Sequence, residues 1–163
     1  MFTKTNKNYS IKVSPIRIAI FLQIVFCFFV FTANAQNANK KNLPGWQTYK
    51  DVAIGMTDVQ VREKLGAPKT DDKDGFYYVF SDTETAQIIF DEGKKVRTVS
   101  VVFSEDHTGA PTFTDVYGKT AVAEPKPDGS IFKMMRYEDA GYWISYSRGA
   151  GAKAMVIVTI QKL

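Results

Sequence analysis

Two sets of three short apolar runs, rich in aromatic and β-branched residues, constrain the fold of this chain most. The first set occupies residues 76–80, 86–90 and 96–103, and the second occupies residues 132–137, 142–147 and 154–161. Runs of this length between polar turn residues are typical of β-strands. The short connections between them predict antiparallel meanders.

Each set of runs follows a segment with the signals of a capped helix. In the first segment, Thr57 and Gln60 have the spacing of an N-terminal capping box. Gly66, expected in a left-handed conformation, and Pro68 mark the end of that helix. The second segment, residues 112–119, is a shorter unit of the same kind. These signals are structural and carry no catalytic chemistry.

The two halves of the chain follow the same plan at an offset of roughly 56 residues. We therefore predict an α+β fold built from two tandem copies of a short helix plus a three-stranded antiparallel meander. Because each copy is too small to bury its apolar face alone, the copies are expected to form one sheet with the helices on one face. The alternative is a single α+β domain in which the similarity between the halves is accidental.

The first 35 residues have the three parts of a secretory signal peptide. Four basic residues and no acidic ones precede an apolar stretch at residues 18–31, and Ala33-Asn34-Ala35 has the small residues that a signal peptidase reads. A transmembrane helix is the alternative, but a span needs roughly 20 apolar residues. We expect cleavage behind Ala35 and a periplasmic or secreted protein.

The leader also accounts for the basic charge of the chain. It holds four of the 21 basic residues and none of the 17 acidic ones, so the remainder is balanced. The basic isoelectric point therefore does not indicate a nucleic-acid partner. The only cysteine, Cys27, lies in the leader behind Phe26, where a lipidated cysteine would need a small residue. No lipid anchor is expected.

These observations predict the organisation of the chain. The parts are a signal peptide at 1–35, a flexible tether at 36–42 and a single two-repeat domain at 43–163, with copy one at about 43–104, a linker at 105–111 and copy two at about 112–163.

Part of the first half resembles a known family. Ile54-Gly55-Met56-Thr57, then Val61, then Leu65-Gly66-Ala67-Pro68 and an aromatic strand at 76–78, is similar to the pattern of BamE/SmpA/OmlA-like domains. That pattern belongs to the wider group with the fold of β-lactamase inhibitory proteins. The resemblance implies either a non-catalytic lipoprotein that supports outer-membrane assembly or a secreted inhibitor that clamps an enzyme. The chain departs from BamE because it lacks a lipidated cysteine and carries a second copy.

The inventory of reactive residues predicts no catalytic, cofactor or metal site. His107 is the only histidine and lies in the predicted linker, and no cysteine remains behind the leader. The sequence behind the leader therefore lacks the residues for a histidine metal cluster or for cysteine–histidine catalysis. Residues 70–75 superficially resemble a calcium loop, but Thr70 and Ser81 occupy positions that need acidic residues, so we expect a solvated turn there.

The aromatic residues of the middle strands supply the remaining candidate site. If Tyr142, Ile144 and Tyr146 face the core, period-two alternation turns Trp143 and Ser145 to the other face. The same argument directs Val99, Val101 and Phe103 inward and Thr98 and Ser100 outward. The candidate partner-binding residues are Trp143, Tyr77, Ser145 and Thr159. Aromatic residues are enriched where proteins dock, but a face covered by helices or by the linker would be core instead.

Together these features predict an exported, non-catalytic protein–protein interaction module whose partner is another envelope or secreted protein. One alternative is a secreted enzyme inhibitor. Another, of a different class, is a small-molecule carrier or hydrolase with a closed apolar pocket beside His107. An open aromatic face favours the first two.

Overall fold

The computed structural model describes residues 44–104 and 108–163. The expected cleavage site behind Ala35, the cysteine Cys27, the tether at 36–42 and the histidine His107 lie outside these residues. The described segments belong to one compact unit. None of the helices in them is long and apolar enough to cross a membrane.

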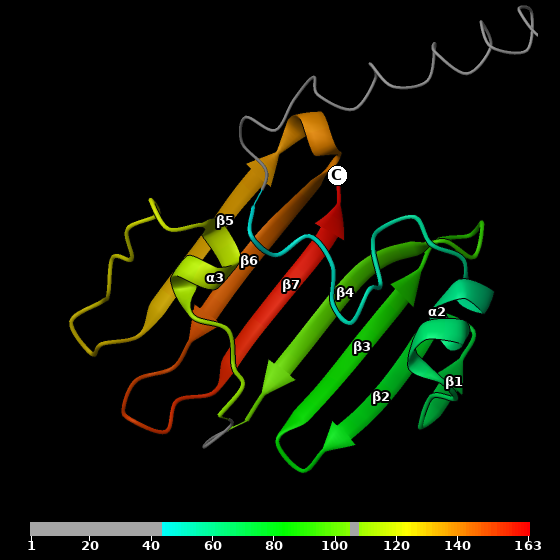
Figure 1. Ribbon diagram of the computed structural model, residues 1–163, viewed down its shortest axis with the longest axis horizontal. Helices are drawn as coiled ribbons and strands as arrows, with labels where there is room; N and C mark the ends of the chain where they lie inside the picture. Colours follow the sequence, from blue (N-terminus) through cyan, green and yellow to red (C-terminus); the bar gives the residue numbers. More distant parts are fainter. Residues whose placement is uncertain (1–43, 105–107) are drawn as a thin grey trace, which may run out of the picture. The chain divides into compact units, whose positions relative to one another are not determined.

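The described chain forms a mixed α+β structure with one seven-stranded antiparallel sheet and two α-helices (Figure 1). In chain order its elements are α2 (Asp58–Leu65), β1 (Thr70–Asp72), β2 (Gly75–Ser81), β3 (Glu84–Phe90), β4 (Val96–Phe103), α3 (Phe113–Tyr117), β5 (Ile131–Tyr137), the short 3-10 helix η1 (Glu138–Ala140), β6 (Tyr142–Arg148) and β7 (Val156–Lys162). The strands lie in the order β1-β2-β3-β4-β7-β6-β5. The last strand of each half, β4 and β7, therefore meet inside the sheet.

The prediction of a solvated turn at residues 70–75 is wrong for the first half of that segment. Thr70–Asp72 forms the edge strand β1 and pairs with β2. All three residues are exposed and polar, so no apolar pattern marks them as a strand. An ion pair between Arg62 of α2 and Asp71 holds the strand beside the helix.

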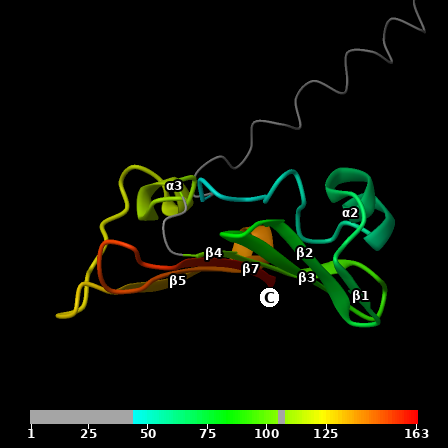
Figure 2. The same ribbon diagram turned by 90° about the horizontal axis from the view of Figure 1, so that it is seen from below.

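Residues opposite each other on neighbouring strands share a face, so the register divides the sheet into two faces, seen edge-on in Figure 2. One face, called the core face, is apolar and buried. Its two central rows are Phe76, Ile88, Val99, Ile160 and Ile144, and Tyr78, Ala86, Val101, Val158 and Tyr146. Close packing of these rows is the main source of stability for the described unit.

Strand β6 confirms the alternation that the sequence predicts. Tyr142, Ile144 and Tyr146 are buried, whereas Trp143 and Ser145 are partly exposed. In β4, Val99 and Phe103 are buried as expected. Thr98 differs, because it points to the opposite face by register and is nevertheless only 5% exposed.

Helix α2 begins and ends where the sequence predicts. Gln60 donates its backbone N–H to Thr57 Oγ1 at 3.3 Å, and Thr57 donates its backbone N–H to Gln60 Oε1 at 2.9 Å, which completes the capping box. Val61 is fully buried. Gly66 has φ of +79° but ψ of −159°, so it ends the helix outside the left-handed helical region that we expected. Its positive φ still favours glycine.

Helix α3 is a single capped turn. Thr112 Oγ1 accepts the backbone N–H of Asp115 at 3.2 Å, and Asp115 Oδ2 accepts the backbone N–H of Thr112 at 2.8 Å. Tyr117 ends the turn and donates its hydroxyl to the carbonyl of Lys133 on β5 at 2.7 Å. The short helix is therefore tied to the sheet through a side chain.

Residues 44–57, called the N-terminal strap, connect the two halves before α2 begins (Figure 1). Trp46 donates its backbone N–H to the carbonyl of Val116 in α3 at 3.2 Å. Further on, Gly55 donates its backbone N–H to the carbonyl of Val96 in β4 at 2.8 Å. The strap thus links an element of the second half to an element of the first.

A partly buried hydrogen bond attaches a tight turn of the strap to β3. Tyr49 and Val52 exchange two backbone hydrogen bonds, and Lys50 and Asp51 between them have φ of +45° and +64°. Tyr49 donates its hydroxyl to Glu84 Oε1 at 2.6 Å. Burial, followed by this hydrogen bond and the negative charge of Glu84, raises the pKa of Tyr49 far above its ordinary value. The phenol therefore stays protonated and keeps the strap attached to β3.

Candidate partner-binding face

The second face of the sheet, called the open face, carries the residues that the sequence analysis selects. Three cross-strand rows define it from β2 to β5. The first row is Gly75, Ile89, Thr98, Gln161, Trp143 and Arg136, the second is Tyr77, Gln87, Ser100, Thr159, Ser145 and Met134, and the third is Val79, Thr85, Val102, Ile157, Ser147 and Phe132.

All four predicted residues lie on this face, but they are not one cluster. Ser145 and Thr159 are direct cross-strand neighbours, and Trp143 is the next residue of β6 on the same side. Tyr77 lies in the same row as Ser145, on the far side of β3, β4 and β7. The structure therefore separates a central group around Trp143 from a peripheral tyrosine.

Hydroxyl groups occupy the middle of the open face. The hydroxyls of Ser100 and Thr159 lie 3.0 Å apart and pair with each other across β4 and β7. Thr98, in the neighbouring row, is buried and its Oγ1 has no hydrogen-bond partner among the described residues. A buried hydroxyl without a partner costs free energy. The centre of the face thus has one unused hydrogen-bonding group.

Exposed apolar side chains lie at both sides of this polar centre. On β2, Tyr77 is 40% and Val79 is 50% exposed, and on β5, Phe132 is 58% and Met134 is 50% exposed. Val79, Phe132 and Met134 are not among the residues predicted from the sequence. The alternation of Phe132 and Met134 with Lys133 was the available signal, but it does not say which side of a strand is covered.

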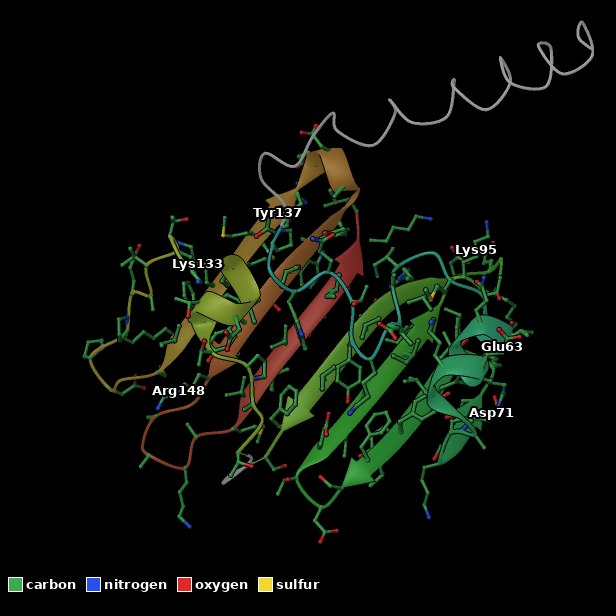
Figure 3. All side chains as sticks on the ribbon, in the orientation of Figure 1. Glu63, Asp71, Lys95, Lys133, Tyr137 and Arg148 are labelled. Carbon is green, nitrogen blue, oxygen red and sulfur yellow. The ribbon has the colours of Figure 1, made fainter. Side chains whose placement is uncertain are left out.

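The open face is almost free of charge. Arg136 is the only charged residue in the three rows; it lies on the edge strand β5 and pairs with Glu138 at 3.6 Å. At the other edge, the exposed Asp72 of β1 lies opposite Gly75 and extends the first row. Other charged residues lie around the periphery of the sheet, such as those labelled in Figure 3: Glu63, Asp71, Lys95, Lys133 and Arg148. A sheet face that only meets water usually carries polar and charged residues. The open face has instead the composition of the centre of a protein interface, where charged residues are depleted.

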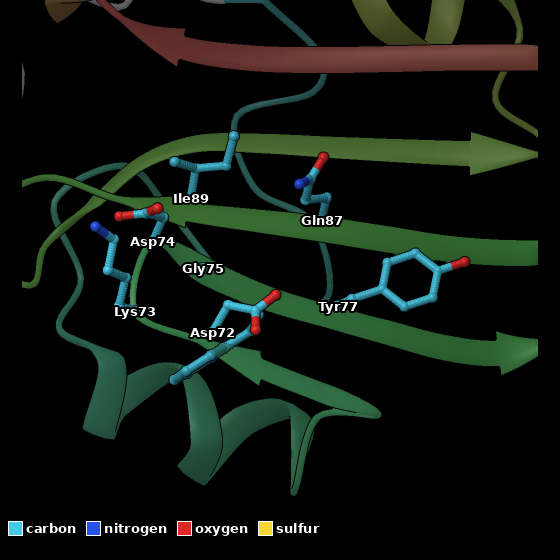
Figure 4. A pocket seen from close by; sticks show the side chains of 8 residues that line it. Asp72, Lys73, Asp74, Gly75, Tyr77, Gln87 and Ile89 are labelled. Atoms are coloured by element: carbon cyan, nitrogen blue, oxygen red, sulfur yellow. The ribbon is translucent and has the colours of Figure 1, made fainter.

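A cavity of about 370 Å³ opens beside the turn between β1 and β2. Its lining residues are Asp72, Lys73, Asp74, Gly75, Phe76, Tyr77, Gln87 and Ile89. Figure 4 shows the Tyr77 ring and the Gln87 amide at one end and Lys73 and Asp74 at the other. The cavity therefore adjoins the open face.

The tyrosines with raised pKa values belong to the core face and to the segments packed on it. Burial raises the pKa of Tyr146 and, more strongly, that of Tyr117, above the ordinary range of a phenol. Both are therefore neutral hydrogen-bonding groups near neutral pH. In the part of the chain that the structure describes, no three His, Cys, Asp or Glu side chains gather as a metal site would require.

Comparison of the chain with models of protein families, with characterised proteins and with solved structures finds no match.

Proposed function

We propose that this protein is an exported, non-catalytic module that binds another envelope or secreted protein through the open face. The observation that carries the proposal is the near absence of charge on a sheet face with partly exposed Trp143, Tyr77 and Met134. Burying such a face against a partner removes apolar area from water without stripping water from charged groups. Trp143 is its expected centre, because aromatic anchors contribute most where an interface excludes water.

The proposal includes an architecture of two tandem copies, each a helix followed by three antiparallel strands, with both helices on the core face. Contacts of Phe113 with Tyr146, whose ring centres lie 5.7 Å apart, and of Gly66 O with the Tyr78 hydroxyl at 3.2 Å support the placement of the helices. Figure 2, where α2 and α3 lie on the same side of the sheet, agrees with it. The pairing of Val101 with Val158 supports the repeat, because these residues correspond in the two halves.

The proposed setting is the bacterial envelope, as the resemblance to BamE/SmpA/OmlA-like domains suggests. The capped α2 and the aromatic strand β2, which carry that resemblance, are present as regular elements. A signal peptide ending at Ala35 would deliver the domain there. Support of outer-membrane assembly is the corresponding role, and the partner would be an assembly factor or an envelope protein that it serves.

The test is capture of partners from an envelope extract with the purified, exported protein and two variants of the open face. Trp143→Ala removes the proposed anchor and should weaken capture by about thirtyfold, because a central interfacial tryptophan commonly contributes 2 kcal/mol or more. Ser145→Arg places a charge beside it and should weaken capture to a similar extent. Val122→Arg is the control, since Val122 is exposed and lies in the coil before β5, outside the three rows.

Capture of the same proteins, at the same level, by all three variants would show that the open face is not the partner surface. Equal loss in all three, including Val122→Arg, would also count against the proposal. A fold measurement by circular dichroism accompanies each variant, so that unfolding is not mistaken for lost binding.

A further inference from the structure

The two edges of the sheet differ in how they are protected against pairing with another chain. The edge strand β1 has three exposed polar residues, and an ion pair from α2 reaches it through Asp71. Short, charged edge strands of this kind are a common protection against edge-to-edge association. The other edge, β5, has seven residues, contains no proline and carries none of these protections except two cations.

Strand β5 exposes apolar side chains on both of its sides. Phe132 and Met134 point to the open face and are 58% and 50% exposed, and Met135 points to the core face and is 37% exposed. A long apolar edge strand is a template for another β-strand. Exposed apolar side chains therefore lie on both faces of the edge strand and not only on the open face.

The backbone of β5 has a described backbone partner on one side only. Its hydrogen-bonded neighbour in the sheet is β6, and in residues 44–104 and 108–163 no other backbone group bonds to it. The coil at residues 119–130 approaches the strand through an ion pair between Lys133 Nζ and Glu124 Oε1 at 3.8 Å. The Lys133 carbonyl accepts the Tyr117 hydroxyl, and the other backbone groups that face away from β6 are available for a further ladder.

We propose that a second copy of this chain pairs with that edge, β5 against β5 in antiparallel orientation, with the two-fold axis at Met134. The axis stands perpendicular to the sheet, so each side chain meets a residue that points to the same side. Such pairing joins the two sheets into one and places the two open faces side by side. The dimer uses the edge of the sheet and leaves Trp143 free to bind another protein. The proposal therefore goes beyond the proposed function, which concerns the open face.

The avoidance of like charges selects this register. With the axis at Met134, all seven residues of β5 overlap, Lys133 lies opposite Met135 of the second copy, and Arg136 lies opposite its Phe132. A guanidinium opposite an aromatic ring is a favourable neighbour. Moving the axis by one residue to Lys133 would place two lysines directly opposite each other, which is destabilising. Moving it to Met135 would shorten the overlap.

The experiment measures the dimer dissociation constant of the purified protein by sedimentation, for the wild type and for variants at two equally exposed positions. Met134 lies on the axis, so Met134→Lys places two like charges opposite each other and removes two buried methionines. It should weaken the dimer at least about tenfold. Val79→Lys is the matched control, because Val79 is also 50% exposed on the open face but lies on β2, far from β5. It should leave the dimer unchanged within about twofold.

A charge-swap pair makes the test independent of folding defects. Met134→Lys and Met134→Glu should each be monomeric alone, and an equal mixture should form a heterodimer, because the axis places the opposite charges together. A wild-type protein that stays monomeric at several hundred micromolar would overturn the proposal. So would a dimer that Met134→Lys leaves intact, a mixture that fails to associate, or equal weakening by Val79→Lys, which would indicate pairing through the open faces instead.

Discussion

At the scale of single residues, strand β6 separates two aromatic residues by face. Tyr146 is 2% exposed, contacts the Phe113 ring and belongs to the core. Trp143, three positions earlier, is partly exposed and is not among the residues packed against the core. The two side chains are large and lie on the same strand. The difference in their surroundings should therefore determine how far each substitution lowers the free energy of unfolding.

We predict opposite consequences for stability and binding at these two positions. Tyr146→Ala should lower the free energy of unfolding by about 3 kcal/mol, because it empties a packed core position. Trp143→Ala should lower it by about 1 kcal/mol or less. Urea unfolding followed by fluorescence and circular dichroism measures both. A loss at Trp143 as large as that at Tyr146 would mean that the indole is part of the core and that the alternation is inverted.

At the scale of elements, the two helices use the same capping geometry with different chemistry. The box of α2 closes with the amide of Gln60, which does not titrate. The box of α3 closes with the carboxylate of Asp115. Hydrogen bonds from the hydroxyl and the backbone of Thr112 lower the pKa of Asp115 below its ordinary value.

This difference predicts that only one cap depends on pH. Because the pKa of Asp115 is depressed in the folded protein, its contribution is present above the ordinary pKa of the carboxyl and is lost as the pH falls through the depressed value. Thr57→Ala should therefore cost about 1 kcal/mol at pH 7 and at pH 3. Thr112→Ala should cost less at pH 3 than at pH 7. Denaturant midpoints at both pH values are the measurement, and an equal pH dependence of the two variants would contradict the assignment.

At the scale of the whole described unit, the N-terminal strap joins parts that are distant in sequence. It contacts α3 through Trp46 and β4 through Gly55, and Tyr49 anchors it to Glu84. Gly45 permits the first of these contacts, because a Cβ at this position would lie 2.3 Å from the carbonyl oxygen of Asp115. Only a residue without a side chain fits there.

We predict that Gly45→Ala destabilises the protein by about 1–3 kcal/mol, the usual cost of forcing atoms into a packed site. The strap should detach from α3, and hydrogen exchange at Trp46 should become faster. Gly93→Ala is the control, since a Cβ there would meet only a side-chain oxygen of Asp91 at 3.3 Å. Equal effects of the two substitutions would show that the close approach at Gly45 is unimportant.

Whether a feature could be predicted from the sequence depends on the range of the interactions that form it. The caps at Thr57 and Thr112, the six long strands and the alternation in β6 could be predicted, because hydrogen bonds over three residues and a side-chain period of two are written in the local sequence. The strand β1 could not, since its exposed residues Thr70–Asp72 have no apolar pattern and pair only because β2 is adjacent. The open face was predicted in outline through Trp143, Ser145 and Thr159, but its apolar sides at Val79 and Phe132 were missed.

By itself, the sequence determined the two capped helices, the six long strands and the alternation of side chains along those strands. Local backbone preference and side-chain size are sufficient for that. Only the tertiary structure decided that β4 pairs with β7, that Thr98 is buried on the open face, and that β5 is left as an apolar edge. These outcomes depend on pairing between segments that are far apart in the chain. The free energy gained by burial is then spread over many residues, so no short sequence pattern predicts it.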